Sequence, residues 1–500
     1  MKILLTTLNA KYIHTSLALR YLKAYSYKDF NNIEIIEYSI NEPTNYILSD
    51  IYGKNPDVIG LSCYIWNIDE TIRLVKLIKK VLPNIKVILG GPEVSFDILY
   101  WLNRVEEIDY IIYGEGELTL NQLLKTINSG EEYDKLLGIA YKDKNGVRVN
   151  PPQIKINLDD LPSPYSDIND LLSIKDKIVY FEASRGCPFS CTYCLSSTDN
   201  NIRFFSIERV KIELTNLINN GVKTIKFVDR TFNANNKFAL EIFKFLIENY
   251  QGTVFQFEIT MDIMDNETID YLVNNAPKGI FRFEIGVQST NENTNSLIKR
   301  RQNFKKLKDN VIRLKKNNNI ALHIDLIAGL PEENYDSFRK TFNDTFELNP
   351  EELQLGFLKV LRGTLMSAEV DKYDYLYMDS APYEVLQNRV LTYGDLIRIK
   401  SVEQILEKYW NSHRMDLTIN YLLKNVFTSA YDFFQEFGDY WESKGWGRIG
   451  HQLESLFIRL HEFLQARRTN NIDFIICFMK LDYLLNHKYK PRKTWWEFEL

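Results

Sequence analysis

The sequence predicts an α/β protein with three successive domains: a doubly wound parallel sheet, a partial (βα)6 barrel and a mainly helical C-terminal domain. Short apolar runs alternate with amphipathic segments until about residue 370, where strand signals fade and long helical patterns begin. Such alternation is typical of parallel sheets covered by helices. A chain of 500 residues also exceeds what one hydrophobic core can organise.

The first domain is expected over residues 1–150. Its predicted strands are short apolar runs, namely Ile3–Leu5, Ile33–Ile36, Val58–Leu61, Val87–Leu89 and Tyr110–Ile112. The segment Ile68–Leu82 carries apolar residues at helical spacing and predicts a helix. Gly138–Val149 predicts a hairpin that turns at Lys144-Asn145-Gly146. Five βα units predict a sheet that binds ligands at the carboxyl ends of its strands.

Polar or glycine-rich segments follow four of these strands. They are Asn9–His14, Ser62–Asn67, Gly90–Glu93 and Gly114–Glu117. Glycine at a strand end lets the backbone approach a large flat ligand closely. At any single turn, glycine and proline can simply punctuate the chain. Four such segments at one edge of the sheet favour a binding site.

A second strand–helix series is expected over residues 175–370, after a polar linker that contains Pro162 and Pro164. Its predicted strands are Ile178–Ala183, Thr224–Val228, Val254–Ile259, Phe281–Val287, Leu322–Ala328 and Leu353–Lys359. Six βα units without a second glycine-rich fingerprint predict a partial barrel. The active site of such a barrel lies at the C-terminal ends of its strands.

The third domain, residues 375–500, is expected to be mainly helical and rich in buried aromatic side chains. The apolar segment Ile472–Leu485 is interrupted by charged residues and is too short to span a bilayer, which needs ~20 apolar residues. It predicts a buried helix, in which Cys477 is expected to be a core residue.

Charge and terminal signals exclude several classes of partner. The net charge is −5, from 61 basic and 66 acidic residues, which gives no electrostatic footprint for nucleic acid. The N-terminal apolar stretch is too short for a signal peptide, and no cleavage site follows it. We therefore expect a cytoplasmic protein that binds neither membranes nor nucleic acid.

Three of the five cysteines, Cys187, Cys191 and Cys194, lie within one short loop. Three thiolates on a compact loop can ligate three irons of a [4Fe–4S] cubane and leave the fourth iron open. The alternative is a structural zinc site with a histidine as fourth ligand. Zinc ligands usually come as two short-spaced pairs, whereas the next histidine or cysteine here is His323.

The spacing C-x-x-x-C-x-aromatic-C resembles the signature of the radical SAM superfamily, and the resemblance covers about residues 178–360. It implies that the cluster passes an electron to S-adenosylmethionine (SAM), which breaks into methionine and a 5′-deoxyadenosyl radical. It also implies an electron donor such as flavodoxin or ferredoxin. The residues implied to bind SAM are Tyr193, Asp229, Glu284, Gln288, Arg301, Ile327 and Gly329.

These SAM residues have different implied roles. Asp229 stands where the family often contacts the methionyl amino group, although the usual Gly-Gly-Glu is missing. Glu284 and Gln288 resemble the fourth-strand contacts to the ribose and carboxylate, and Glu284 could instead pair with a neighbouring arginine. Arg301 could pair with the SAM carboxylate. Ile327 and Gly329, together with the glutamate that ends their motif, resemble the fifth-strand contact to adenine.

The N-terminal domain resembles the cobalamin-binding domain that precedes many radical SAM domains. The D-x-H-x-x-G motif that supplies an axial histidine is absent, so the resemblance implies base-off cobalamin without a histidine ligand. His14 is interpreted as a helix-start residue, and Tyr64 or Trp66 is expected at the lower face of the corrin. The residues implied to bind cobalamin are Asn9, Tyr64, Trp66, Gly90, Gly91, Glu93, Gly114, Glu115 and Gly116.

The whole chain resembles a bacterial family of B12-binding radical SAM proteins whose C-terminal domain has no known function. The pairing of cofactors implies methyl transfer to an unreactive carbon or phosphorus of an unknown substrate. A rearrangement or cyclisation without a methyl product remains open. A tRNA methylthiotransferase is disfavoured because the N-terminal domain has only Cys63 and the tail is not strongly basic. A non-catalytic iron–sulfur or cobalamin sensor is the remaining alternative.

Overall fold

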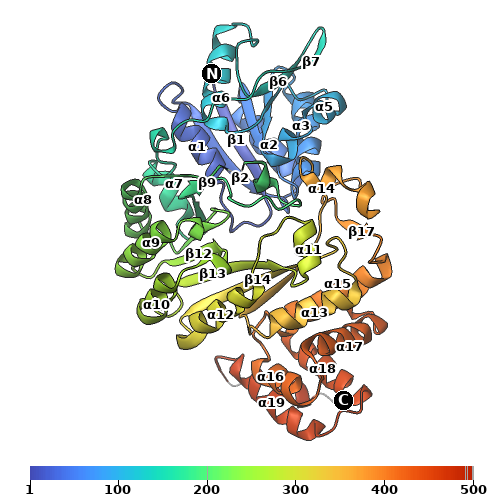
Figure 1. The fold of residues 1–500 in the computed structure, drawn as a ribbon. Helices are drawn as coiled ribbons and strands as arrows, with labels where there is room; N and C mark the ends of the chain where they lie inside the picture. Colours follow the sequence, from blue (N-terminus) through green and yellow to red (C-terminus); the bar gives the residue numbers. More distant parts are fainter. Residues whose placement is uncertain (200, 490, 492–493, 498–500) are drawn as a thin grey trace.

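The computed structural model describes residues 1–199, 201–489, 491 and 494–497. The N-terminal sheet domain lies against one end of the barrel, and the C-terminal helices continue from the barrel's far edge to the opposite end of the molecule (Figure 1). The α/β fold class predicted from the sequence is confirmed. No helix among the described residues is long and apolar enough to cross a membrane.

The N-terminal domain is a seven-stranded sheet in the order β2-β1-β3-β4-β5-β6-β7. The strands are β1 Ile3–Asn9, β2 Ile33–Ser39, β3 Val58–Ser62, β4 Lys86–Gly90, β5 Tyr110–Ile112, β6 Ile139–Asp143 and β7 Gly146–Val149. Strands β1 to β5 are parallel, and the predicted hairpin β6–β7 extends their sheet antiparallel. The strand order changes direction between β1 and β3, which creates a switch point where such sheets bind ligands.

Helices cover both faces of this sheet. They are α1 Leu17–Ser26, α2 Thr44–Lys54, α3 Ile68–Val81, α4 Pro92–Ser95, α5 Ile98–Arg104 and α6 Gly116–Ser129. Because side chains alternate along a strand, Val58 and Ile59 pack into two separate cores. The core on one face contains side chains of α1 and α6, and the other contains side chains of α2, α3 and α5.

The barrel has six parallel strands in the order β15-β14-β13-β12-β11-β8. These are β8 Ile178–Phe181, β11 Thr224–Phe227, β12 Val254–Ile259, β13 Phe281–Gln288, β14 Ile320–Ala328 and β15 Glu352–Phe357. Their helices are α8 Ile207–Asn219, α9 Asn236–Asn249, α10 Asn266–Asn275, α11 Glu292–Leu297, α12 Phe304–Leu314 and α13 Tyr335–Phe346. The six strands predicted from the sequence are confirmed, with shifts of at most a few residues at their ends.

Shorter elements connect these units. Helix α7 Ile168–Ile174 precedes the barrel, β9 Ser184–Arg185 pairs with β10 Arg203–Phe204, and α14 Leu365–Ala368 follows β15. The region expected to be mainly helical begins with an antiparallel strand pair, β16 Leu376–Tyr377 and β17 Val385–Gln387. This pair forms because the chain first returns along the edge of the barrel, where Lys359 bridges to Glu384.

The helices of the last region are α15 Tyr393–Tyr409, α16 Asp416–Asn425, α17 Ala430–Ser443, α18 Leu453–Ala466 and α19 Ile472–Leu485. Helix α19 has the predicted bounds, but the expectation that it is buried is wrong. It packs against α16 and α18 at the end of the molecule, which leaves its other side uncovered (Figure 1). Phe474 is 53% exposed, and Cys477 is exposed instead of lying in the core.

Candidate active site

The three-cysteine loop follows β9 at the C-terminal end of the first barrel strand. Gly186 opens it with φ +101°, and a Cβ there would lie 2.6 Å from the carbonyl oxygen of Asn201, so only glycine fits. Backbone hydrogen bonds then hold the loop, from Cys187 N to Asp199 O and from Thr192 N to Ile298 O. Cysteines 187 and 191 are buried, and Cys194 is half-buried.

The donor set of this loop fits a cubane cluster. Burial raises the pKa of the Cys187 and Cys191 thiols, and the three sulfur groups are close enough to repel each other as thiolates. Bound iron removes that penalty because it takes the place of the thiol protons. Within the described ranges, no group of three or more His, Cys, Asp or Glu side chains could hold a single metal ion. In a cubane, each of three cysteines binds a different iron.

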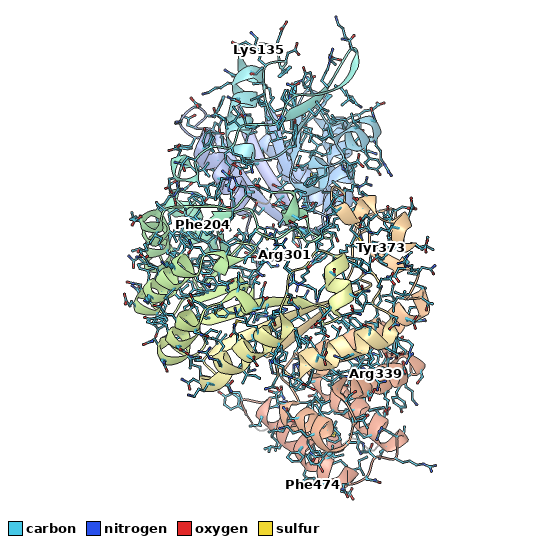
Figure 2. The ribbon with its side chains drawn as sticks, in the orientation of Figure 1. Lys135, Phe204, Arg301, Arg339, Tyr373 and Phe474 are labelled. Carbon is cyan, nitrogen blue, oxygen red and sulfur yellow. The ribbon has the colours of Figure 1, made fainter. Side chains whose placement is uncertain are left out.

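Arg300 supports the cysteine loop, and the sequence analysis missed it. Its guanidinium reaches the Cys191 thiol, donates to Tyr193 Oη at 3.3 Å, and donates to the carbonyl oxygen of Gly286. The predicted residue Arg301 is exposed and lies in the central region of the molecule in Figure 2. Two consecutive arginines were the only signal in the sequence, and periodicity cannot show which of them points inward from a turn.

The Asp229 carboxylate faces the end of the first barrel strand, and its expected contact with the SAM amino group stays a prediction. Its carboxylate accepts hydrogen bonds from Ala183 N at 2.9 Å and from Ser184 Oγ at 2.5 Å. Burial raises the pKa of Asp229 to about 7. The residue therefore anchors the strand that leads into the cysteine loop. Its neighbour Arg230 faces the cavities described below and lies 3.6 Å from Glu258.

Glu284 and Gln288 lie on β13, which ends with a register shift against β14. The Glu284 carboxylate pairs with neither Arg282 nor Arg301 but with Lys226 Nζ, at 2.7 and 2.9 Å. Gln288 has φ +68°, and its buried Oε1 finds no hydrogen-bond partner in the described part of the chain. A buried acceptor without a partner is costly, so this oxygen is available to a ligand donor.

Ile327 and Gly329 lie at the end of β14, as predicted. Ile327 is half-buried against the barrel core. Gly329 has φ +94°, and its carbonyl oxygen accepts hydrogen bonds from Tyr375 Oη at 3.0 Å and from Asn388 Nδ2 at 3.2 Å. Both donors come from the segment after the barrel, so this strand end is held by residues from outside the barrel strands.

A cavity of about 900 Å³ lies between the N-terminal sheet and the barrel. Its size is typical of sites for large ligands. The residues predicted to bind cobalamin that line it are Asn9, Tyr64, Trp66, Gly90, Gly91, Gly114, Glu115 and Gly116. The structure does not place Glu93 in this lining. The Glu93 carboxylate is buried and accepts a hydrogen bond from Tyr383 Oη, because the chain after the barrel packs against this loop.

The sheet wall of this cavity is formed by backbone and aromatic rings. Gly91 has φ +110°, and a Cβ there would lie 2.5 Å from the carbonyl oxygen of Cys63. The rings of Tyr64 and Trp66 stack at 4.3 Å between centroids with an interplanar angle of 6°. Because Trp66 remains 48% exposed, the pair presents a flat platform to the cavity.

The interpretation of His14 as a helix-start residue is wrong. Helix α1 begins at Leu17 with Ser16 as its N-cap, whereas His14 bridges to Ile178 of the barrel. Its Nδ1 lies 2.8 Å from Tyr180 Oη, and the ring lines the cavity. His14 lies outside the helix because the loop after β1 contacts the first barrel strand before α1 begins.

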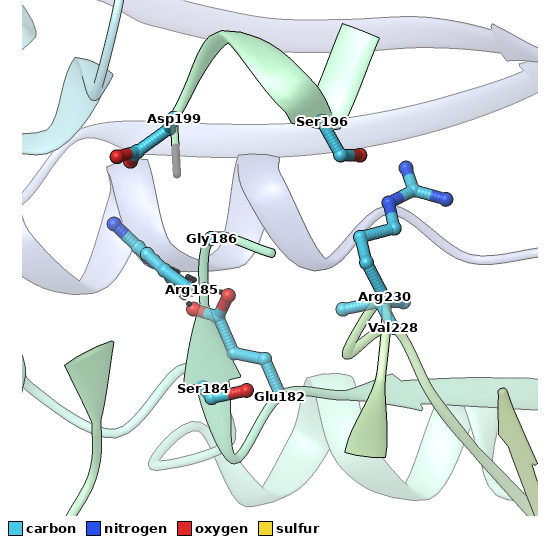
Figure 3. A pocket seen from close by; sticks show the side chains of 8 residues that line it. All are labelled: Glu182, Ser184, Arg185, Gly186, Ser196, Asp199, Val228 and Arg230. Atoms are coloured by element: carbon cyan, nitrogen blue, oxygen red, sulfur yellow. Dashed lines mark hydrogen bonds and ion pairs between the residues drawn. The ribbon is translucent and has the colours of Figure 1, made fainter. Parts of the chain in front are cut away.

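A charged network joins the cysteine loop to the N-terminal domain. Arg185 donates to Glu182 at 2.7 Å and to Glu117 at 2.6 Å, and it also pairs with Glu115. A smaller cavity of about 220 Å³ opens beside this network (Figure 3). Its lining residues are Glu182, Ser184, Arg185, Gly186, Ser196, Asp199, Val228 and Arg230. The loop that carries the cysteines is therefore tied directly to a glycine-rich loop of the sheet wall.

Comparison with known proteins assigns a family to each of the three regions. Residues 3–124 match the B12 binding domain, residues 181–345 match the Radical SAM superfamily, and residues 371–500 match a family of proteins of unknown function, DUF4080.

Two curated relatives are similar over part of the chain. An uncharacterized methyltransferase of Pyrococcus horikoshii is 34% identical over 234 residues, which is 45% of this chain and 51% of that protein. The cobalamin-dependent radical SAM methyltransferase TokK of Streptomyces tokunonensis is 28% identical over 331 residues, which is 61% of this chain and 47% of that protein. The matched part thus spans about half the length of these relatives.

Two solved structures share the fold. The methyltransferase TsrM from Kitasatospora setae, with cobalamin and a [4Fe-4S] cluster bound, aligns with a TM-score of 0.62 at 16% identity, covering 74% of this chain and 75% of that chain. The cobalamin-dependent radical enzyme OxsB, with aqua-cobalamin and SAM bound, aligns with a TM-score of 0.66 at 18% identity, covering 97% and 79%. The three regions of the chain therefore match, in order, the B12 binding domain, the Radical SAM superfamily and the DUF4080 family.

Proposed function

We propose that this protein is a cobalamin-dependent radical SAM enzyme that transfers a methyl group to an unreactive carbon or phosphorus. The observation that carries the proposal is the cavity between the two domains. One of its walls is built from the glycines and stacked rings of the B12-binding domain, and the other from strand ends of the barrel next to the cysteine loop. A relative that is 28% identical over 331 residues is a cobalamin-dependent radical SAM methyltransferase.

The cysteine loop would hold a [4Fe–4S] cluster through Cys187, Cys191 and Cys194. When bound and reduced, such a cluster supplies one electron that cleaves SAM into methionine and a 5′-deoxyadenosyl radical. Arg300 keeps the loop in place through Cys191 and Tyr193. A one-electron donor such as flavodoxin or ferredoxin would serve this site.

SAM would bind between the cysteine loop and the ends of β13 and β14. The Oε1 of Gln288, which has no hydrogen-bond partner among the described residues, would accept a hydrogen bond from the ribose or the amino group. Arg301, which is exposed, can form a bidentate pair with the methionyl carboxylate. Tyr193, Ile327 and Gly329 would surround the adenine.

Cobalamin would bind against the sheet wall. Gly90, Gly91 and Gly114 line the cavity without side chains, so the corrin could approach the backbone there, and the platform of Tyr64 and Trp66 offers it a flat apolar contact. We assign no cobalt ligand to His14, because its Nδ1 is engaged with Tyr180 on the barrel side. The bound cobalamin would then lie over the barrel mouth, where a substrate can meet both cofactors.

A radical rearrangement or cyclisation without methyl transfer is the second candidate. OxsB, a cobalamin-dependent SAM radical enzyme, adopts the same fold. The residues that line the cavity do not distinguish the two reactions, since both use the same pair of cofactors.

Product analysis separates these candidates. Anaerobically reconstituted protein with hydroxocobalamin, SAM and dithionite should accumulate both 5′-deoxyadenosine and S-adenosylhomocysteine. Formation of 5′-deoxyadenosine without S-adenosylhomocysteine would support the second candidate and reject methyl transfer. If neither product forms beyond the level of a Cys187→Ala variant, the protein is not a SAM-cleaving enzyme.

A further inference from the structure

Residues 359–391, here called the bridging segment, run from the end of the last barrel strand to the first C-terminal helix. The segment folds back on itself, since Val360 N donates to Tyr383 O at 2.9 Å, and it returns to the end of β15, where Val385 N donates to Leu358 O at 2.9 Å. The segment therefore crosses the same end of the barrel at which the cofactor loops lie. Most of it falls within the DUF4080 match, to which no function is attached.

The bridging segment contacts the B12-binding domain through a buried polar cluster. Tyr383 Oη donates to the Glu93 carboxylate, and these side chains are only 3% and 5% exposed. Arg362 donates to the Tyr383 hydroxyl at 3.2 Å and pairs with Asp97. The Arg362 guanidinium also stacks 4.2 Å from the ring centroid of Tyr100. A buried carboxylate needs such partners, so the contact is specific and not merely apolar packing.

Glu93 belongs to the loop that forms part of the cavity wall. Gly90, Gly91 and Pro92 before it line the cavity, as does Phe96 after it. The bridging segment touches this loop at a second point, because a side chain at Gly363 would overlap the ring of Phe96. The segment thus fixes the position of a loop whose opposite side would contact cobalamin.

The same segment also contacts the other two cofactor loops. Tyr375 Oη and Asn388 Nδ2 both donate to the carbonyl oxygen of Gly329, at the strand end proposed for adenine. Met366 N donates to Thr192 O at 2.9 Å, inside the cysteine loop. One continuous segment is therefore hydrogen-bonded to three loops: the loop around Glu93, here called the cobalamin loop, the cysteine loop at Thr192, and the strand end at Gly329, here called the SAM loop.

We propose that the bridging segment is a positioning element that holds the three cofactor loops in mutual register, with Tyr383 as the positioning residue for the cobalamin loop. This inference rests on the proposed function, because it assumes that cobalamin and SAM bind at these loops. Pre-organised loops bind more tightly, since less ordering is required on binding. Because one element holds all three loops, SAM binding should also strengthen cobalamin binding.

The test uses full-length, cluster-reconstituted protein and a titration with hydroxocobalamin followed by its visible absorbance. Tyr383→Phe keeps the ring but removes the hydroxyl donated to Glu93. It should weaken hydroxocobalamin binding about tenfold, as expected for a lost hydrogen bond to a charged group. Tyr373→Phe is the matched control. It removes another buried hydroxyl of the bridging segment, one whose charged neighbour is Lys372 of the same segment, and should leave the affinity unchanged.

A second variant covers the case in which Tyr383→Phe disturbs folding. Glu93→Gln retains an acceptor oxygen for Tyr383 and should bind hydroxocobalamin within about threefold of the wild type, whereas Glu93→Ala should match Tyr383→Phe. Titration with and without saturating SAM measures the coupling between the two sites. SAM should tighten hydroxocobalamin binding in the wild type, and this gain should shrink in Tyr383→Phe.

The outcomes distinguish the two proposals. If the wild type binds hydroxocobalamin and Tyr383→Phe binds it equally well, the positioning role is overturned and the proposed function stands. Equal weakening by Tyr383→Phe and Tyr373→Phe would also overturn it. If the wild type does not bind hydroxocobalamin, the proposed function itself fails.

Discussion

The two walls of the central cavity are lined by different chemical groups. The sheet wall presents glycine backbone and stacked rings, as at Gly91 and in the pair formed by Tyr64 and Trp66. The barrel wall presents charged side chains that are already paired, such as Lys226 with Glu284. The first wall is shaped for a large flat ligand and the second for charged or polar groups. Substitutions on the two walls should therefore impair the protein for different physical reasons.

The largest effect is expected on the barrel side, from Cys191→Ala. Without this buried thiol the loop retains two cysteines, which cannot hold a stable [4Fe–4S] cluster. Iron and sulfide content after anaerobic reconstitution should fall from about four of each per chain to near zero. Cys477→Ala is the control, because that thiol is exposed on α19. Full iron content in Cys191→Ala would remove this residue from the ligand set.

On the sheet wall, Gly91→Ala should be the most damaging change. The new Cβ would meet the carbonyl oxygen of Cys63 at a positive φ, so the loop must move or the fold must absorb strain of about 1–3 kcal/mol. Thermal unfolding should show a lower Tm, and hydroxocobalamin affinity should fall at least tenfold. Gly53→Ala, in helix α2 with open space around it, should raise stability by about 0.5–1 kcal/mol. An equal change of Tm in Gly91→Ala and Gly53→Ala would contradict the close contact between Gly91 and Cys63.

A pH-dependent effect is expected from a buried carboxyl group on the barrel side. Burial raises the pKa of Glu333, which is 1% exposed, to about 7 from a usual value near 4.5. The folded state then binds the proton more tightly than the unfolded state. Its stabilising contribution is full below pH 4.5 and is lost as the pH rises to about 7, by at most ~3 kcal/mol.

Glu333→Gln tests whether Glu333 causes stability to fall as the pH rises. The variant should flatten the decline in Tm between pH 5 and pH 7.5, measured without added cofactors. The amide can still accept hydrogen bonds from Ser289 and Thr341, which hold the carboxyl group at 2.6 and 2.7 Å. A variant whose Tm falls as steeply as that of the wild type would show that Glu333 does not cause the decline.

The smallest effect is expected from Trp66→Ala on the sheet wall. It removes one ring of the aromatic platform, worth about 1 kcal/mol of contact with a flat ligand, so hydroxocobalamin affinity should fall about fivefold. The protein's stability should hardly change, since the ring is 48% exposed. Tyr46→Ala, which removes an exposed ring of α2, should alter neither quantity. An unchanged affinity in Trp66→Ala would place cobalamin away from this platform.

Features set by the local sequence could be predicted, and side-chain partners could not. The six barrel strands follow from apolar runs, and the glycine-rich strand ends meet at one edge because parallel strands share a direction. The orientation of Asp229, Glu93 and His14 depends on Ala183, Tyr383 and Tyr180, which are far away in the sequence. Periodicity carries no information about such partners.

The exposure of the last helix, α19, could not be predicted either, because it also depends on distant parts of the chain. The apolar composition of α19 suggests burial, but its exposure depends on how many neighbours the end of the molecule provides, which is a property of the whole fold. The sequence also could not show whether Arg300 or Arg301 points toward the cysteine loop, because that depends on the backbone geometry of the turn. Lys299 has φ +54° just before them, and this turn geometry decides which guanidinium reaches the cysteine loop.

The central claim is that one cavity wall holds cobalamin while the loop at the other holds a [4Fe–4S] cluster. The most direct measurement is the metal content and absorption spectrum of the full chain after anaerobic reconstitution with iron, sulfide and hydroxocobalamin, followed by removal of unbound ligand. The account predicts about four irons and one cobalt per chain, with the bands of both cofactors in one spectrum. Loss of cobalt on desalting, or iron content well below four, would contradict it.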